Sequence, residues 1–371
     1  MCRLKVIISG GGTGGHIFPA ISIADEIRER FPDADILFIG AEDRMEMERV
    51  PAAGYRITGL PVSGFNRTQK LKNINVILKL FKSLCMARKI IRNFKPQIVI
   101  GVGGYASGPA LCMASLLRIP ILIQEQNFCA GLTNRLLAWR ADRICVAYRS
   151  MQRFFPPERI IITGNPVRKD LRALRAKDPQ AMDYFGCRDA KPVLLVLGGS
   201  LGARTINRGL QRGLDDMINA GIHIIWQTGK SDYDTVKDHL KDHACEGVWY
   251  SDFISRMDYA YSAADLVVSR AGAGTIAELS LLQKPVILVP SPNVAEDHQN
   301  KNAHALSENN AAVILPDHQA EEQLAPLAMK IIADPQQLHF LSENIALFAQ
   351  LNSTGRIVDE VMRIINIPPD E

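Results

Sequence analysis

The sequence contains no apolar run that approaches the roughly 20 residues needed to span a bilayer as a helix, although 47% of its residues are hydrophobic. Its first residues lead directly into a strand-like run, without the pattern of a signal peptide. Low-complexity segments and short-period repeats are also missing. These absences disfavour integral membrane, secreted and disordered proteins, and we expect a soluble or peripheral globular protein.

Paired or clustered cysteines are missing as well. The seven cysteines are scattered, and none forms a C-x-x-C pair or stands with a histidine at the spacing of a zinc site. This pattern is typical of free thiols in a reducing compartment. No pair of carboxylates has the spacing of a metal-ligand motif either, so the sequence predicts neither disulfides nor a metal site.

Negative charge is absent from one long stretch of the first half. No aspartate or glutamate occurs between Glu48 and Glu125, whereas twelve lysines and arginines do. The net charge of the whole chain is only +4, so the remainder of the chain is net negative. This concentration of positive charge favours an anionic partner for one face of the first half.

The most informative feature that is present is a set of four glycine-rich turns, each directly after a short aliphatic and β-branched run. The turns occupy residues 10–16, 101–105, 198–202 and 272–275. A buried parallel strand has such a sequence, and glycine lets the backbone approach a ligand before the next helix begins. Two turns fall in each half, so we expect two doubly wound α/β domains with their ligand-facing ends turned toward one another.

Strand-like runs alternate with helical patterns along the chain, which is typical of βαβ units and parallel sheets. The runs are residues 4–9, 36–39, 98–101, 121–123, 144–147, 160–163, 193–197, 223–226, 266–269, 286–289 and 312–314. A length of 371 residues favours two domains over one, and the proline-bearing stretch before Pro166 suits a crossing between them. Residues 356–365 have helical spacing and could pack on either domain.

Residues 71–94 predict a long helix with two apolar faces. The face suited to a domain core consists of Val76, Leu80, Leu84, Ala87, Ile91 and Phe94. The second stripe lies nearly opposite and consists of Ile74, Leu78, Phe81 and Cys85, bordered by Lys70, Lys79 and Lys82. Apolar residues rimmed by long basic side chains suit insertion into the headgroup layer of an anionic membrane. The alternatives are a helix buried on both sides and a protein partner.

The first glycine turn nearly matches a dinucleotide-binding loop, but its surroundings disfavour one. Glu42 and Asp43 come about two positions later than a ribose-binding acid should. His16 opens the following helix, beyond the carboxyl end of the first strand, where open α/β sheets bind ligands. A helix N-terminus lowers the proton affinity of an imidazole and keeps it available as a base. We therefore interpret His16 as a base or substrate contact, with a loop cap or phosphate contact as the alternative.

The later turns offer groups for an anion and a ribose. The turn 198–200 precedes a helix from Ala203, so backbone N–H groups and the Ser200 hydroxyl could hold a diphosphate. The turn 270–275 repeats this design and adds Glu278, whose carboxylate could accept both hydroxyls of a ribose. A tight turn that merely needs glycine and an exposed helical glutamate are the alternative interpretations. Residues 297–300 add polar groups after the strand 286–289.

Taken together, these motifs resemble the MurG family of peptidoglycan glycosyltransferases. The matching motifs follow the family's order and are Gly10–His16 with Pro19, Gly103–Tyr105 with Ser107–Pro109, Glu125–Asn127, Gly164–Arg168, Gly198–Ser200 and Arg270–Glu278. The resemblance implies two Rossmann-like domains facing across a cleft, the GT-B glycosyltransferase fold. It implies an acceptor-binding, membrane-associating domain in residues 1–166, a UDP-sugar domain in 167–352, and a C-terminal helix in 353–371 that returns to the first domain.

The resemblance also implies site residues by position in the motifs. UDP-N-acetylglucosamine would be bound by Ser200, Ile254, Ala273, Gly274, Thr275, Glu278 and Gln299, with Arg168 near the diphosphate and with Thr13, Gly14, Gly15 and Asn127 of the first domain. The acceptor side would be lined by His16, Tyr105, Glu125 and Gln126. The sequence departs from the family at Leu201, where glutamine is common, and at Gln124, where many members have histidine. Polar contacts at these two positions are therefore in question.

The implied reaction is an inverting transfer of N-acetylglucosamine from UDP to the C4 hydroxyl of lipid-linked N-acetylmuramyl-pentapeptide, converting lipid I to lipid II. This step belongs to peptidoglycan synthesis and hence to cell wall biogenesis, cell shape and division. His16 is our candidate for the base that such a transfer needs, and Glu125 is the first alternative. Helix N-termini and Arg168 could replace a metal at the diphosphate, so we expect no cofactor.

The implied acceptor is anchored in the cytoplasmic leaflet by a polyprenyl chain, which gives the second stripe of residues 71–94 a purpose. We expect Ile74, Leu78, Phe81, Lys79 and Lys82 to contact an anionic membrane. The expected partners are the undecaprenyl-linked acceptor, that surface and neighbouring cell-wall enzymes, but no nucleic acid. The protein would be peripheral, at the cytoplasmic face of the plasma (inner) membrane.

Three alternatives remain at this point. The first is another nucleotide-sugar enzyme of the same fold, an epimerase or a natural-product glycosyltransferase, against which the basic face and the motif 125–127 argue. The second is a non-enzymatic nucleotide-sugar-binding scaffold at the membrane, which would bind donor but release no UDP. The third is a dehydrogenase, which would bind a nicotinamide cofactor instead.

Overall fold

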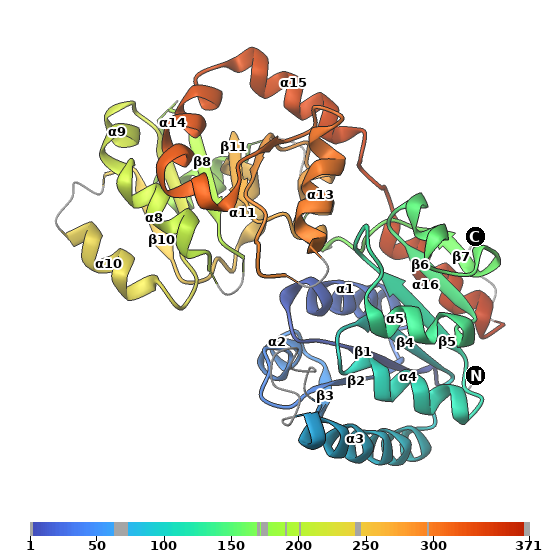
Figure 1. Ribbon diagram of the computed structural model, residues 1–371. Coiled ribbons are helices and arrows are strands. Elements are labelled where there is room, and N and C mark those ends of the chain that lie inside the picture. The colour runs from blue at the N-terminus through green and yellow to red at the C-terminus, as the bar shows by residue number, and fades with distance from the viewer. Residues whose placement is uncertain are drawn as a thin grey trace. The chain divides into compact units, whose positions relative to one another are not determined.

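The computed structural model describes residues 3–62, 73–168, 171, 177–189, 191–199, 202–241, 246–294 and 297–366, and for residues 73–75 it describes the backbone only. The chain divides into two compact units (Figure 1). The first unit combines Met1–Arg168 with Gln350–Glu371, and the second consists of Lys169–Ala349. Which unit binds which substrate stays a prediction.

The first unit contains a seven-stranded sheet in the order β3-β2-β1-β4-β5-β6-β7, with every pair of neighbours parallel. The strands are β1 (Lys5–Gly10), β2 (Asp35–Ala41), β3 (Arg56–Leu60), β4 (Ile98–Gly103), β5 (Ile121–Glu125), β6 (Arg143–Val146) and β7 (Ile160–Ile162). The chain reverses its direction of travel across the sheet between β1 and β4. This is the topological switch point at which doubly wound sheets bind ligands.

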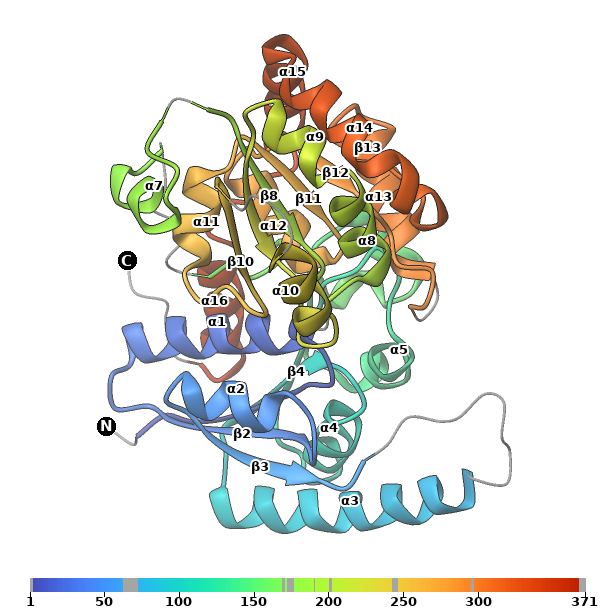
Figure 2. The ribbon, with the colours of Figure 1, turned by 90° about the vertical axis from the view of Figure 1, so that its left-hand side faces the viewer.

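Helices cover both faces of this sheet (Figure 2). They are α1 (Gly14–Arg30), α2 (Glu46–Ala52), α3 (Asn73–Phe94), α4 (Ser107–Leu116), α5 (Leu132–Leu137) with the 3-10 turn η2 (Ala138–Arg140), and α16 (Ser353–Ile364). Strand side chains alternate between faces, so Val6 and Ile8 join the core beneath α1 and α16, while Ile7 joins the core beneath α3, α4 and α5. Two further 3-10 turns are η3 (Arg149–Arg153) and η4 (Pro157–Arg159).

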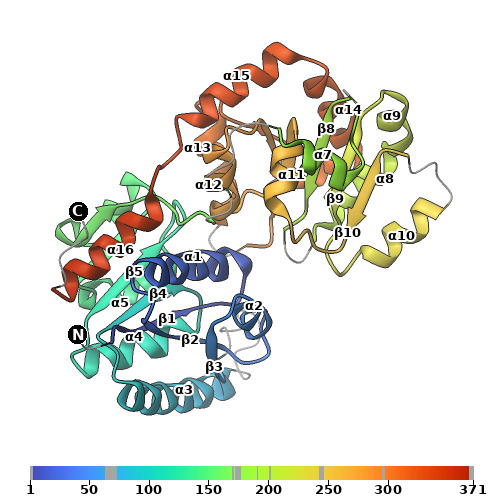
Figure 3. The same cartoon turned by 180° about the vertical axis from the view of Figure 1, so that it is seen from behind.

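The C-terminal helix α16 packs against α1, which begins more than 300 residues earlier in the chain (Figure 3). Ile357, Val361 and Met362 are buried in the core that α1 also covers. Arg356 adds a hydrogen bond to the carbonyl of Ile162 at 2.7 Å. These contacts place the end of the chain in the first unit.

The second unit contains a six-stranded parallel sheet in the order β10-β9-β8-β11-β12-β13. The strands are β8 (Val193–Leu197), β9 (His223–Gln227), β10 (Val248–Ser251), β11 (Leu266–Ser269), β12 (Val286–Leu288) and β13 (Val313–Ile314). The switch point here lies between β8 and β11. Both units therefore have the Rossmann arrangement that the glycine turns predicted.

The helices of the second unit surround a single large core. They are α7 (Pro179–Phe185), α8 (Arg204–Arg212), α9 (Leu214–Asn219), α10 (Tyr233–Lys241), α11 (Met257–Ala263), α12 (Ala273–Leu281), α13 (His298–Ser307), α14 (Ala320–Ile332) and α15 (Pro335–Ala346), with the 3-10 turn η6 (Asp317–Gln319). α8 and α14 pack closely because Gly209 leaves room for the neighbouring backbone. A Cβ atom there would lie 2.2 Å from the carbonyl oxygen of Ala320.

The sequence predictions missed two strands, β3 and β10. Each is the outermost strand at one edge of its sheet, and most of its side chains are only partly buried. Their sequences, RITGL and VWYS, do not have the continuous aliphatic run that was the signal used to find the other strands.

The long helix predicted for residues 71–94 is α3, and Leu71 lies outside the described residues. Val76, Ala87 and Ile91 are buried, as the first stripe requires. Leu80 was also expected in the core but is exposed. The buried face runs instead through the small Ser83, which leaves Leu80 at its margin. No helix in the described part of the chain combines the length and apolarity that crossing a bilayer requires.

Candidate active site

The switch point of the first sheet brings two glycine turns into backbone contact. The turn after β1 leads into α1, and the turn after β4 leads into α4. A Cβ atom on Gly104 would lie 2.3 Å from the carbonyl oxygen of Gly11, and Gly104 has a positive φ of 83°. Only glycine satisfies both conditions, so these two turns contact each other through their backbones at the carboxyl edge of the sheet, and we call the pair the floor of the site.

His16 stands on this floor, in the first turn of α1. Its Nδ1 atom lies 3.3 Å from the Oγ1 atom of Thr13, the residue that precedes the helix. A Cβ atom on Gly103 would lie 2.7 Å from Cδ2 and 2.9 Å from Nε2 of the imidazole. The glycine therefore makes room for the ring. Tyr105, which was predicted on the acceptor side, follows Gly104 in the chain and is exposed.

Glu46 supports the first glycine turn from inside the protein. The sequence analysis did not identify this residue. Its side chain is fully buried, and its carboxylate accepts hydrogen bonds from the N–H groups of Gly12 and Ala41, both at 2.9 Å. Gly11 and Gly40 leave the space that it fills, because a Cβ atom on Gly11 would lie 2.0 Å from Oε1. Glu46 is 34 residues from Gly12 in sequence, so no local motif connects the two.

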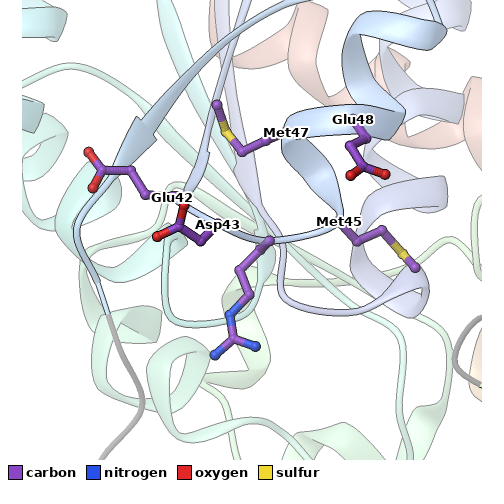
Figure 4. Close-up of a pocket in the computed structure, with 6 residues that line it drawn as sticks. Glu42, Asp43, Met45, Met47 and Glu48 are labelled. Carbon is purple, nitrogen blue, oxygen red and sulfur yellow. The ribbon is translucent and has the colours of Figure 1, made fainter. Parts of the chain in front are cut away.

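A pocket of about 440 Å³ opens beside Glu46, at the turn between β2 and α2 (Figure 4). It is lined by Glu42, Asp43, Arg44, Met45, Met47 and Glu48. Three carboxylates against one guanidinium make its wall net negative. Because like charges repel, this pocket is poorly suited to the diphosphate of a nucleotide sugar.

Glu125 is almost completely buried at the end of β5. Its Oε1 atom accepts from the backbone and side-chain N–H groups of Asn127 at 3.1 and 3.2 Å. Its Oε2 atom accepts from the N–H of Gly131 at 3.0 Å and from Asn134 Nδ2 at 2.9 Å. A carboxylate with four donors organises the turn that leads into α5. The geometry therefore favours a positioning role for Glu125 over the role of alternative base.

Gln126, predicted on the acceptor side, is also buried and belongs to an amide network. Its Nε2 atom donates to the carbonyl of Val102 at 2.9 Å and to Oε1 of Gln124. Gln124 in turn donates to Asn165 Oδ1 at 3.3 Å, and Asn165 donates to the carbonyl of Gln126 at 3.0 Å. Gln124, which stands where many family members have histidine, thus makes polar contacts within this network.

The switch point of the second sheet carries two helix N-termini. α8 begins after Ala203 and α12 after Gly272, and within the described residues neither has a side-chain cap or an acid in its first turn. Helix N-termini of this kind bind anions through their backbone N–H groups. A Cβ atom on Gly274 would meet no neighbouring atom, so the start of α12 faces open space. Ser200 and Leu201, which precede α8, lie outside the described residues.

Several predicted donor residues lie on α12 and α13 of the same unit. Glu278 projects from α12, is partly exposed and accepts from the hydroxyl of Tyr261 at 2.9 Å. Ala273 is buried and Thr275 is half-buried in the first turn of α12. Gln299, in α13, accepts from the N–H of Ser291 at 2.8 Å and so orders the loop after β12.

Gln227, at the end of β9, was not predicted from the sequence. Its Nε2 atom donates to the carbonyl of Gly199 at 3.0 Å, and its Oε1 atom accepts from the N–H of Ile254 at 3.0 Å. It therefore connects the glycine turn after β8 to buried Ile254, one of the predicted donor residues. The signal that could have found it is a polar residue at the carboxyl end of a predicted strand.

The predicted donor residues of the first unit lie at the same edge of their sheet. Thr13 and Gly15 are exposed, Gly14 and Asn127 are half-buried, and all four follow the carboxyl ends of β1 or β5. The guanidinium of Arg168 lies 5.5 Å from the ring centroid of Phe18 on α1. Among the described residues, no group of three or more His, Cys, Asp or Glu side chains is arranged to hold a metal ion.

Two Rossmann-like units, each with its candidate site residues at a topological switch point, define the GT-B architecture of nucleotide-sugar glycosyltransferases. Two family models match the chain. The model for the glycosyltransferase family 28 N-terminal domain matches residues 6–146, and the model for the family's C-terminal domain matches residues 193–353. The chain belongs to glycosyltransferase family 28.

Relatives from Parabacteroides distasonis and Bacteroides fragilis are 59% and 56% identical to this chain, over 99% and 97% of its length and 100% and 96% of theirs. Both are named UDP-N-acetylglucosamine–N-acetylmuramyl-(pentapeptide) pyrophosphoryl-undecaprenol N-acetylglucosamine transferase. The crystal structure of Acinetobacter baumannii MurG is similar with a TM-score of 0.73 at 27% identity, covering 97% of this chain and 100% of that one. The resemblance to the MurG family is therefore confirmed.

The fold is shared more widely than the sequence. A crystal structure of UDP-N-acetylglucosamine 2-epimerase is similar with a TM-score of 0.67 at 15% identity, covering 100% of this chain and 99% of that one. This likeness shows the fold alone, because one fold hosts many activities. Identity over nearly the whole chain favours the transferase over the epimerase.

Proposed function

We propose that this protein transfers N-acetylglucosamine from UDP-N-acetylglucosamine to the C4 hydroxyl of lipid-linked N-acetylmuramyl-pentapeptide, which completes lipid II in peptidoglycan synthesis. The observation that carries the proposal is identity over nearly the full length with transferases of that name. Each unit also supplies part of the chemistry that the reaction needs. The first has an imidazole at its switch point, and the second has two helix N-termini and a carboxylate.

His16 is proposed as the general base. The acceptor hydroxyl must lose its proton as it attacks the anomeric carbon, and an imidazole nitrogen near neutral pKa is suited to accept it. The ring sits over Gly103, and Nδ1 lies close to the Thr13 hydroxyl. Nε2 is then the nitrogen that would take the proton. Glu46 and the touching glycine turns would fix the floor on which the ring stands.

The departing UDP carries the negative charge that the transition state develops. The N-termini of α8 and α12 would stabilise that charge through backbone N–H groups, and Arg168 would add a cation. Glu278 would accept the ribose hydroxyls, and Tyr261, which donates to its carboxylate, would orient it. We therefore propose leaving-group stabilisation by the protein alone, without a metal.

We also propose that α3 attaches the protein to a membrane. Leu78 and Phe81 are 65% and 68% exposed, and Lys79 and Lys82 beside them are exposed too. The side chain of Ile74 and residue Lys70 lie outside the description. An apolar stripe with a basic rim would enter an anionic headgroup layer and bring the enzyme to its lipid-linked acceptor. This would make the protein peripheral at the cytoplasmic face of the membrane.

The deciding experiment measures UDP release from UDP-N-acetylglucosamine, with and without detergent-dispersed lipid-linked muramyl-pentapeptide, each with and without a metal chelator. We expect release that requires the acceptor and persists with the chelator. Release without acceptor would indicate an epimerase-like or hydrolytic enzyme. Donor binding without any release would indicate a scaffold, and loss of activity with the chelator would refute metal-free stabilisation.

A further inference from the structure

The exposed large apolar side chains on the helices of the first unit all lie on one layer. They are Ile77, Leu78, Leu80 and Phe81 of α3, Leu116 of α4, and Leu132, Leu136 and Trp139 of α5 and η2. Within the described residues, α1, α2 and α16 contribute none. α3, α4 and α5 share the same core, and α4 packs against both of the others. The exposed apolar side chains of α3, α4 and the α5–η2 segment therefore belong to one helical layer of the first unit.

Leu132, Leu136 and Trp139 form a strip, which we call the α5–η2 strip. They are 62%, 71% and 72% exposed, and their spacing of four and three residues places them on one helical face. The opposite side of the same segment is packed, because Ala138 is buried and Leu137 is partly buried in the core. The segment is thus amphipathic, with its apolar surplus directed away from the protein.

The surroundings of the strip are basic. Arg135 directly precedes Leu136 and Arg140 directly follows Trp139, and both arginines are exposed. Arg140 also donates to the hydroxyl of Ser115 at 3.2 Å, which ties η2 to α4. Glu125 is the only acid from residue 107 to residue 140, and it is buried with four hydrogen-bond donors. The exposed Asp142 that follows is outnumbered by the exposed Arg135, Arg140 and Arg143, so the exposed formal charge around the strip is net positive, which complements anionic lipid headgroups.

We propose that the α5–η2 strip is a second membrane-contact element, which enters the headgroup layer of an anionic bilayer together with α3. This inference rests on the proposed function to the extent that membrane attachment through α3 does. A single helix lying in the interface leaves the protein free to roll about the helix axis. A second line of contact removes that freedom. Because α5 begins directly after the turn that Glu125 organises, it would fix the carboxyl edge of the first sheet relative to the bilayer.

Trp139 provides a direct test, because it is the exposed tryptophan of the chain. Trp226 is completely buried and Trp249 is partly buried, both in the second unit. In a Trp249→Phe variant, the emission of Trp139 would be followed as vesicles of anionic phospholipids with brominated acyl chains are added. We expect a blue shift and loss of emission that follow the binding curve and disappear in Trp139→Phe/Trp249→Phe. Vesicle binding with unchanged Trp139 emission would overturn the proposal.

A second variant tests the energetics of the strip. Leu136→Ser should weaken binding to anionic vesicles about tenfold, because one large apolar side chain loses its buried area. UDP-N-acetylglucosamine affinity should not change, and Leu347→Ser, an equally exposed change in the second unit, should affect neither. Equal vesicle binding by both variants would contradict membrane insertion of the strip. A blue shift that grows with protein concentration without vesicles would show that a second copy covers the strip instead.

These outcomes are independent of the transferase assay, which is run in detergent. If the protein releases no UDP in the transferase assay but the vesicles still quench Trp139, the proposed function is refuted and the membrane contact stands. If UDP release depends on the acceptor but the vesicles do not quench Trp139, the proposed function stands and the membrane contact of the strip is refuted.

Discussion

At the scale of single residues, His16 is the side chain on which the proposed chemistry depends most. Replacement by alanine removes the imidazole and its contact with the Thr13 hydroxyl, but it leaves the backbone contact between the two glycine turns in place. We expect His16→Ala to lower turnover by about 10²–10⁴ with little change in donor affinity, as removal of a general base does. Single-turnover rates and UDP-N-acetylglucosamine binding would be measured together. Near-normal turnover would exclude His16 as the base.

Glu46 acts on the same floor from inside the protein, so its replacement should affect catalysis indirectly. A glutamine has only one acceptor oxygen, so one of the N–H groups of Gly12 and Ala41 would face an amide NH₂. We expect Glu46→Gln to destabilise folding by about 1–3 kcal/mol, the cost of a buried unsatisfied group, and to lower kcat by tenfold or more. The checks are urea unfolding and steady-state kinetics.

The matched control for that change is Glu48→Gln, on the same short helix but exposed. It should leave stability and kcat within error. Equal effects of the two changes would mean that net charge, not the buried hydrogen bonds, is responsible. Unaltered kcat in Glu46→Gln, with the expected loss of stability, would limit Glu46 to a purely structural role.

The same residues show what could be predicted from sequence. His16 and Glu278 could be proposed from the sequence because each follows a strand-glycine-helix pattern within a few residues, and their roles stay predictions. Glu46 and Gln227 were not, because their partners lie 34 and about 28 residues away and become neighbours only when the sheets form. Asn134, one of the four hydrogen-bond donors to the Glu125 carboxylate, is likewise separated from Glu125 by a turn. Local pattern identifies candidates for substrate contact, and the fold is needed to identify the side chains that hold their turns in place.

At the scale of secondary-structure elements, the predictions were most accurate for interior strands. Each predicted run of the two sheets is a strand, because each is a short and mainly aliphatic run, as parallel strands have. β3 and β10 were missed because their sequences, RITGL and VWYS, lack such a run, whereas the edge strands β7 (III) and β13 (VI) have one. α3 was predicted as a helix with two apolar stripes, one more than a single core needs. The described part of the second stripe is exposed.

That exposed stripe yields the prediction at this scale. Leu78→Ser/Phe81→Ser should weaken binding to anionic vesicles by about ten- to a hundredfold, since two large apolar side chains no longer leave water. Donor affinity should be unaffected, because the N–H groups and side chains proposed to bind it belong to other elements. Vesicle co-sedimentation and UDP-N-acetylglucosamine binding are the measurements.

The control is Phe340→Ser/Leu347→Ser, which removes two exposed apolar side chains from the second unit. It should leave vesicle binding unchanged. Equal weakening by both double variants would indicate non-specific adsorption, and no weakening by the α3 variant would remove this helix from the membrane-contact surface.

At the scale of the whole molecule, the chain leaves the first unit near residue 168 and returns to it near residue 350. The core of the first unit is therefore completed only when α16 has packed on α1. Ile357→Ala should cost about 2–5 kcal/mol, as truncation of a buried isoleucine does. We expect that loss to appear as faster amide hydrogen exchange in β1 and α1, more than 300 residues away in sequence.

Strands β8 and β11 of the second unit should keep their exchange rates in Ile357→Ala, because their core contains no part of α16. The reciprocal variant is Leu341→Ala, which truncates a buried side chain of α15 in that second core. It should speed exchange in β8 and β11 and spare β1. Equal acceleration of both sheets by either variant would mean that the two units unfold as one cooperative body. Separate responses would show that each Rossmann-like unit has its own stability, with α16 assigned to the first by packing and not by sequence order.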